Sequence, residues 1–157
     1  MAARGALHMR AAIVAARLIN ADLAFDHLQH ARSLADVVPE GIYYGTAFGP
    51  SSLHVHEVSL SVELGDATGA LEAARSHAPP SDLPAERRSH YYLSAALAQL
   101  WLGMRDDALQ SLQVARRIAP QHVREHPQVR DALVTLLRLY RNPPQQLLAF
   151  AEWARAI

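Results

Sequence analysis

The feature that most constrains the fold of this chain is an internal repeat. The segment LGDATGAL at 64–71 recurs as LGMRDDAL at 102–109, about 38 residues further on. Self-similarity at a period of roughly 20 to 50 residues indicates an array of stacked supersecondary units. In a helix–turn–helix unit the shared glycine allows the turn, and the shared alanine lets the second helix approach the first closely. We therefore expect this chain to fold into helical hairpins.

The stretch before the first copy allows two interpretations. Residues 58–64, VSLSVEL, alternate apolar and polar side chains, which is typical of a β-strand. The alternative is a helix packed on two sides, with Leu53, His56, Leu60 and Leu64 on one face. The matching stretch before the second copy, YYLSAALAQLWLG, is rich in alanine and leucine and does not alternate. Because equivalent positions in a repeat share a structure, we predict a helix over residues 52–64.

Composition places the chain in the all-α class. Half of its 157 residues are apolar but only 6% are aromatic, so leucine and alanine supply the packing. We expect one domain, a tetratricopeptide-repeat-like α-solenoid of stacked hairpins at about 2–38, 51–78, 85–119 and 128–156. The absence of cysteine excludes disulfides and thiol chemistry. The fifteen basic residues, all arginine, balance fifteen acidic ones, so no net field attracts nucleic acid or an anionic membrane.

The N-terminal third gives weaker signals. We expect residues 2–20 to form a helix with one apolar stripe made of Leu7, Ala11, Val14 and Leu18. The segment Asn20-Ala21-Asp22 sits where Leu64-Gly65-Asp66 sits later, so Asp22 is expected to cap a helix over 23–37. Residues 41–50, GIYYGTAFGP, predict a structured loop whose aromatic side chains fill the gap between two hairpins.

Residues 89–120 resemble the tetratricopeptide repeat. The positions that fall at the spacing of that signature are Tyr92, Ala96, Gly103, Ala108, Leu112, Ala115 and Pro120. The copy at 51–80 departs from the signature, because Ala74 and His77 replace the expected large and small residues. The resemblance implies a short right-handed array with a concave groove.

A longer resemblance covers roughly residues 10–140. The runs TAFGPSSLHVHEVSLSVELGDATGALEAA, LPAERR and RIAPQHVREHPQVRDALVTLLR resemble the C-terminal half of actinobacterial helix-turn-helix transcriptional regulators. In that family a Cro-like DNA-binding domain precedes a helical sensor and dimerisation region. Because residues 1–40 are expected to form the first hairpin, the resemblance implies a binding or regulatory module without direct contact to nucleic acid. The expected partner is a peptide, a small ligand or a protein, including a second copy in a homodimer, and the expected location is the cytoplasm.

The first helix of each unit is expected to line the groove. The residues that we assign to it are Ser52, His56, Ser59, Glu63, His90, Leu97, Trp101 and Tyr43. A polar stripe around His56 would hydrogen-bond a ligand, and Trp101 would anchor one. The alternatives are a solvated helix edge at His56, core packing of Trp101, and a position of Tyr43 in the gap between two hairpins rather than in the groove.

One short motif suggests metal chemistry. His122-Val-Arg-Glu125-His126 matches the H-x-x-E-H pattern, in which two histidines hold zinc and the glutamate polarises water. Here it lies between Pro120 and Pro127, which leaves room for little more than one helical turn. We therefore expect no metal, cofactor or catalytic residue. A zinc-dependent hydrolase using these three residues and a purely structural adaptor remain the alternative functions.

Overall fold

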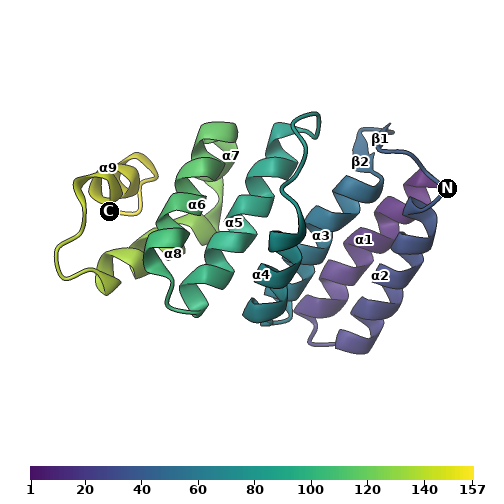
Figure 1. Cartoon of the computed structure of the whole chain (residues 1–157), viewed down its shortest axis with the longest axis horizontal. Coiled ribbons are helices and arrows are strands. Elements are labelled where there is room, and N and C mark those ends of the chain that lie inside the picture. The colour runs from purple at the N-terminus through teal and green to yellow at the C-terminus, as the bar shows by residue number, and fades with distance from the viewer.

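The computed structural model describes all 157 residues as nine helices and one two-stranded sheet (Figure 1). The all-α class expected from the sequence is confirmed. The elements are α1 (Ala2–Arg17), α2 (Ala21–Ala35), β1 (Gly41–Tyr43), β2 (Thr46–Phe48), α3 (Pro50–Glu63), α4 (Ala67–Ser76), α5 (Ala85–Trp101), α6 (Arg105–Ile118), α7 (Pro120–Glu125), α8 (Pro127–Leu139) and α9 (Gln145–Trp153). The pairs α1/α2, α3/α4 and α5/α6 follow one another along the long axis, and α7 to α9 complete the C-terminal end. No helix combines the length and the hydrophobicity that a bilayer crossing requires.

Helix α3 lies in the middle of this row and is buried on nearly all sides. It contacts α1 and α2 on one side and α4 and α5 on the other. Its buried residues are Ser52, Leu53, His54, Val55, His56, Val58, Ser59, Leu60 and Val62. Two-sided burial explains why its apolar residues lack a single helical stripe. The helix predicted for this stretch is confirmed, and the alternation at 58–64 is a by-product of this burial.

The three helix pairs share one turn geometry. Ile19, Gly65 and Gly103 adopt left-handed backbone conformations with φ of 59°, 77° and 75°. In each turn the next amide donates a hydrogen bond to a carbonyl five residues earlier, at 2.8 to 3.0 Å. This bond and the left-handed residue define the Schellman motif that ends a helix. The first pair therefore has the same turn geometry as the other two, with an isoleucine where they have glycine.

The register of that first copy differs from our expectation. The turn 18–20 matches 64–66 and 102–104, so Asn20, rather than Asp22, corresponds to Asp66. The Asn20 side chain accepts a hydrogen bond from the Leu23 amide at 3.1 Å. Asp66 accepts one from the Gly69 amide at 2.8 Å. The prediction of Asp22 as the cap was wrong because asparagine two residues earlier already satisfies the free amides of the first turn.

A fully buried alanine follows each turn at the same distance. Ala24, Ala70 and Ala108 lie in the first turn of α2, α4 and α6, and each is 0% exposed. A side chain of this size lets two helix backbones approach closely. These alanines therefore set the packing distance within each helix pair.

The inner face of α1 is the opposite of the one that we predicted. Leu7, Val14 and Leu18 are 70%, 56% and 74% exposed. The buried residues of the helix are Gly5, Ala6, Met9, Ala12, Ala15 and Ala16. Small residues face inward because α1 packs closely against α2 and against the ring of Phe48. On α2 the buried residues are Ala24, Leu28, Ala31 and Ala35, while Leu23 is 43% exposed.

The expected loop at 41–50 is a β-hairpin. β1 and β2 pair antiparallel with Ile42 opposite Ala47. Tyr44 and Gly45 occupy the turn, both with positive φ, which is the conformation that tight hairpins prefer. Phe48 is fully buried and fills the space above Gly5, whereas Tyr44 is 97% exposed. Only one of the three aromatic residues is therefore deeply buried between neighbouring elements.

The core consists of two main clusters. One contains 13 buried residues from α1 to α3 and the hairpin, among them Met9, Leu28 and Phe48. The other contains 15 buried residues from α5 to α9, among them Leu133 and Phe150. Two smaller clusters, from α3 to α5, join them. The molecule is thus stabilised by contacts between neighbouring units.

Candidate functional site

A concave pocket of about 320 Å³ opens between α1, α3, α5 and the end of α7. Ile13 and Val14 are its only hydrophobic lining residues. The polar and charged ones are Arg10, Arg17, His56, Ser59, Glu63, Glu86, Arg87, His90, His122 and His126. These helices come from four different parts of the chain, so only the stacked arrangement assembles the pocket. It is the strongest candidate for a binding site.

Four residues that the sequence assigns to the groove line this pocket. They are His56, Ser59 and Glu63 on α3 and His90 on α5. The Ser59 side chain is buried, and its hydroxyl donates a hydrogen bond to the Val55 carbonyl at 3.0 Å.

The other four assigned residues lie elsewhere. Ser52 is fully buried, and its amide donates to the Glu40 carboxylate at 2.9 Å. Leu97 packs against the core clusters, and Trp101 is 54% exposed at the end of α5. The Tyr43 hydroxyl donates to the Pro39 carbonyl at 2.8 Å. The chain therefore gives these side chains packing or surface positions away from the pocket.

Sequence reasoning missed the arginines of the pocket. Arg10 and Arg17 lie seven residues apart on α1, which places them on the same face two turns apart. That spacing could have predicted that Arg10 and Arg17 face the same side. We did not make this prediction, because we assigned the inner face of α1 from its apolar residues. Arg87 and Arg88 are neighbours in the sequence, and the local pattern does not show which of them faces a pocket. In the structure Arg87 faces the pocket, because α5 turns this position toward α3.

The three arginines have different surroundings. Arg17 donates to the Glu63 carboxylate at 2.7 Å, and this hydrogen bond raises the pKa of the guanidinium. Arg10 and Arg87 have no carboxylate within 4.0 Å. The Arg87 guanidinium instead donates to Nδ1 of His56 at 3.2 Å. Burial lowers the pKa of Arg87, and the positive charge of Arg10 lowers it further. Two arginines thus face one pocket without a close ion pair, and Glu86 and Glu40 offset the lowering of the Arg87 pKa only in part.

Burial lowers the pKa of three pocket histidines, His56, His90 and His126. Burial lowers the pKa of His56 to about 3, and the charge of Arg87 adds to this shift. Burial lowers the pKa of His90 to about 4, with His126 and His122 contributing. The pKa of His126 is lowered too, again mainly by burial. At neutral pH the imidazoles of His56 and His90 are therefore uncharged, and Nδ1 of His56 accepts the hydrogen bond from Arg87.

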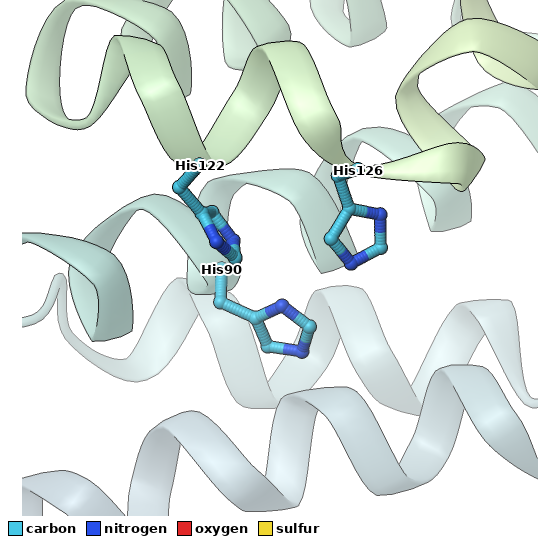
Figure 2. Close-up of side chains that lie close together, drawn as sticks. All are labelled: His90, His122 and His126. Atoms are coloured by element: carbon cyan, nitrogen blue, oxygen red, sulfur yellow. The ribbon is translucent and has the colours of Figure 1, made fainter.

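Three of these histidines gather in one place (Figure 2). His90 comes from α5, His122 from α7 and His126 from the junction of α7 and α8. One nitrogen of each lies within 4.8 Å of the others. The proximity of His90 was not visible in the sequence, because 32 residues separate it from His122.

The glutamate of the H-x-x-E-H motif lies outside the pocket. Glu125 is exposed and accepts a hydrogen bond from the Gln121 side chain at 3.1 Å. It lines a separate shallow surface site with Arg124 and Arg130. His122 lies on the six-residue helix α7 and His126 directly follows it, and both side chains point toward His90 (Figure 2). Glu125 does not line the pocket that these histidines share. A hydrolase built on this motif would lack its expected base.

The pocket thus combines unpaired arginines with neutral histidines in a mostly polar concavity. Comparison with protein-family models, curated proteins and solved structures finds no match.

Proposed function

We propose that this chain is a non-enzymatic binding module whose concave pocket takes a small ligand carrying a carboxylate or phosphate group. In this proposal it acts as a tetratricopeptide-repeat-like sensor region similar to those of bacterial transcriptional regulators, and it works in the cytoplasm. The observation that carries the proposal is that Arg10 and Arg87 face one pocket with no carboxylate within 4.0 Å.

The positive charges of Arg10 and Arg87 favour the binding of an anion in the pocket. Arg10 and Arg87 repel each other, and this repulsion contributes to the lowered pKa of Arg87. An anion placed between them removes the repulsion and accepts charge-assisted hydrogen bonds from two guanidinium groups. Because Arg87 is partly buried, its interaction with an anion is less screened by water than a surface pair.

The size and lining of the pocket favour a small molecule over a peptide. A pocket of about 320 Å³ is near the lower end of the range for small-molecule sites. Only two apolar residues line it, so it lacks the apolar anchors on which peptide-binding grooves rely. A zinc-dependent hydrolase is less well supported, because Glu125 lies outside the pocket.

The test measures anion binding by isothermal titration calorimetry with citrate and with inorganic phosphate. The protein is first stripped of metal with a chelating resin, so that only the arginines are tested. Arg10 is exposed, so Arg10→Ser is expected to preserve the fold. Loss of a charged hydrogen-bond partner is worth about 1.5 to 3 kcal/mol, which corresponds to roughly 10- to 100-fold weaker binding.

Arg4→Ser is the matched control, because Arg4 is also exposed on α1 but does not line the pocket. This variant should bind both anions as the unchanged protein does. Equal affinities in the two variants would overturn the proposal. No binding of either anion would favour a purely structural adaptor.

A further inference from the structure

We propose that His90, His122 and His126 form a binding site for one divalent transition-metal ion of the zinc class. This inference goes beyond the anion proposal and does not depend on it. It also replaces the expectation from the sequence that the chain holds no metal, which considered His122 and His126 without His90.

The backbone fixes where the three side chains point. Pro120 and Pro127 occupy the first positions of α7 and α8, which sets the length of α7 between them. Val123 is fully buried in the C-terminal core and holds α7 in place. His122 and His126 lie four residues apart, so they emerge from the same side of the helix. Figure 2 shows that both rings reach the space above α5 that the ring of His90 also faces.

The spacing suits a tetrahedral ion. The candidate nitrogens lie within 4.8 Å of one another. Zinc–nitrogen bonds of about 2.0 to 2.1 Å place tetrahedral ligands about 3.3 Å apart, so small side-chain rotations close the site. The ring plane of His122 is tilted by 68° to that of His90 and by 66° to that of His126. Rings that are tilted in this way, unlike stacked ones, can direct lone pairs to a common point.

Unpaired nitrogen atoms point to a ligand that the chain itself does not supply. Nε2 of His122 and Nδ1 of His126 are buried and have no hydrogen-bond partner. A buried polar atom without a partner costs about 1 to 3 kcal/mol. A metal ion would use such a lone pair, because a metal binds histidine through a ring nitrogen that carries no proton.

The donor set selects the metal class. Three imidazoles suit zinc, copper, nickel or cobalt, whereas magnesium and calcium require oxygen ligands. Three protein ligands leave one coordination position open, which is the pattern of non-structural zinc sites. That open position would face the pocket that also contains Arg10 and Glu63.

A second histidine cluster in the chain provides a control. Nδ1 of His8 lies 3.0 Å from Nδ1 of His27, and the His8 and His30 rings stack nearly parallel at 10°. Nδ1 of His30 is already bonded to the Asp26 carbonyl at 2.8 Å. Because the His8 and His30 rings stack and the Nδ1 atoms of all three histidines already have partners, this cluster is not expected to hold an ion with comparable affinity.

The experiment titrates the full chain, free of any histidine tag and of bound metal, with zinc alone and with cobalt alone in a buffer without phosphate or carboxylate. We expect one ion per chain by equilibrium dialysis, and visible absorption bands of tetrahedral cobalt. His122→Gln should weaken binding at least about 100-fold, because even the loss of a group supporting a metal ligand costs 10- to 100-fold. His30→Gln and Glu125→Gln should leave the affinity unchanged.

A measurement on the unchanged protein covers the case in which His122→Gln does not fold. Imidazole nitrogen NMR should show that zinc perturbs three of the nine histidines, assigned to His90, His122 and His126. Perturbation of the His8 cluster instead, or equal loss of affinity in His30→Gln and His122→Gln, would overturn the proposal. Absence of zinc binding would overturn it too, while leaving the anion proposal untouched.

Discussion

The three turns between paired helices differ at the residue that adopts the left-handed conformation. Ile19 holds a left-handed conformation at φ 59° that Gly65 and Gly103 adopt without steric strain. The isoleucine side chain is 93% exposed, so no packing compensates for the strain. A β-branched residue in this conformation is a genuine outlier. The first turn therefore stores strain that the other two lack.

Replacing Ile19 with glycine should stabilise the protein. The left-handed conformation costs an L-residue about 1 to 2 kcal/mol, and glycine avoids this at a smaller cost in unfolded-state entropy. We expect the free energy of unfolding in urea, followed by circular dichroism, to rise by about 1 kcal/mol. The reverse control is Gly65→Ala, which should lower it by a similar amount. An added Cβ there meets no atom within 4 Å, so strain alone acts. A destabilised Ile19→Gly variant would contradict this account.

His56 should make the stability of the metal-free protein depend on pH. Its pKa is about 3 in the folded state and 6.5 when unperturbed, so the unfolded chain binds the extra proton between these values. Stability is therefore fully present above pH 6.5 and falls as the pH decreases toward 3, by at most about 1.4 kcal/mol per pH unit for one histidine. The charged groups that deepen this shift are Arg87 and His90 on α5 and Arg10 on α1.

The measurement is the free energy of unfolding in urea at pH 7, 6 and 5. His56→Gln should flatten the decrease between these values, because one titrating group is removed. A conservative amide keeps a polar partner for the Arg87 guanidinium, which bonds His56 at 3.2 Å. An unchanged pH profile in this variant would mean that other groups control the acid sensitivity.

At the scale of elements, the buried alanines limit the size of the side chain that fits between the two helices of each pair. Ala108→Leu should destabilise the protein by about 1 to 3 kcal/mol, since the position is 0% exposed and the added atoms force α6 away from α5. The measurement is the urea midpoint at constant m-value. Ala149→Leu on α9 is the matched control, because Ala149 is exposed and a surface change stays within about 0.5 kcal/mol. Similar losses in both variants would contradict the role of Ala108.

The elements themselves were predictable where the repeat signal was strong. The copies at 64–71 and 102–109 identified the turns of α3/α4 and α5/α6, because glycine and alanine are needed at fixed places there. The inner face of α1 was not predictable from apolar residues. Small side chains, rather than Leu7 and Val14, face the core in a close helix pair. The β-hairpin at 41–48 was missed because each strand has only three residues.

The candidate site was predictable only in part. His56, Ser59 and Glu63 follow from the position of α3 as the first helix of a unit. The meeting of His90 with His122 depends on how α7 packs against α5, which no local pattern encodes. Long-range contacts of this kind need the whole fold.

At the scale of the whole molecule, the two main core clusters predict separable unfolding. Leu28→Ala in the N-terminal cluster should cost about 2 to 5 kcal/mol locally. The only two tryptophans, Trp101 and Trp153, lie in the C-terminal half. We therefore expect the urea midpoint by circular dichroism to fall more than the midpoint by tryptophan fluorescence, as in arrays stabilised by neighbouring contacts.

Leu133→Ala in the C-terminal cluster is the complementary variant. It should lower the urea midpoint by tryptophan fluorescence more than the midpoint by circular dichroism, because both tryptophans belong to that half. Coincident midpoints in both variants would show that the helices unfold as one cooperative unit.

The contact between Gly5 and Phe48 has an evolutionary consequence. The aromatic ring occupies the space that a Cβ on residue 5 would need, and it is also what fixes the hairpin to α1. In sequences descended from the same ancestor, these two positions should change together. A lineage that gains a side chain at position 5 must lose the ring at 48, and a lineage that keeps the ring must keep the glycine.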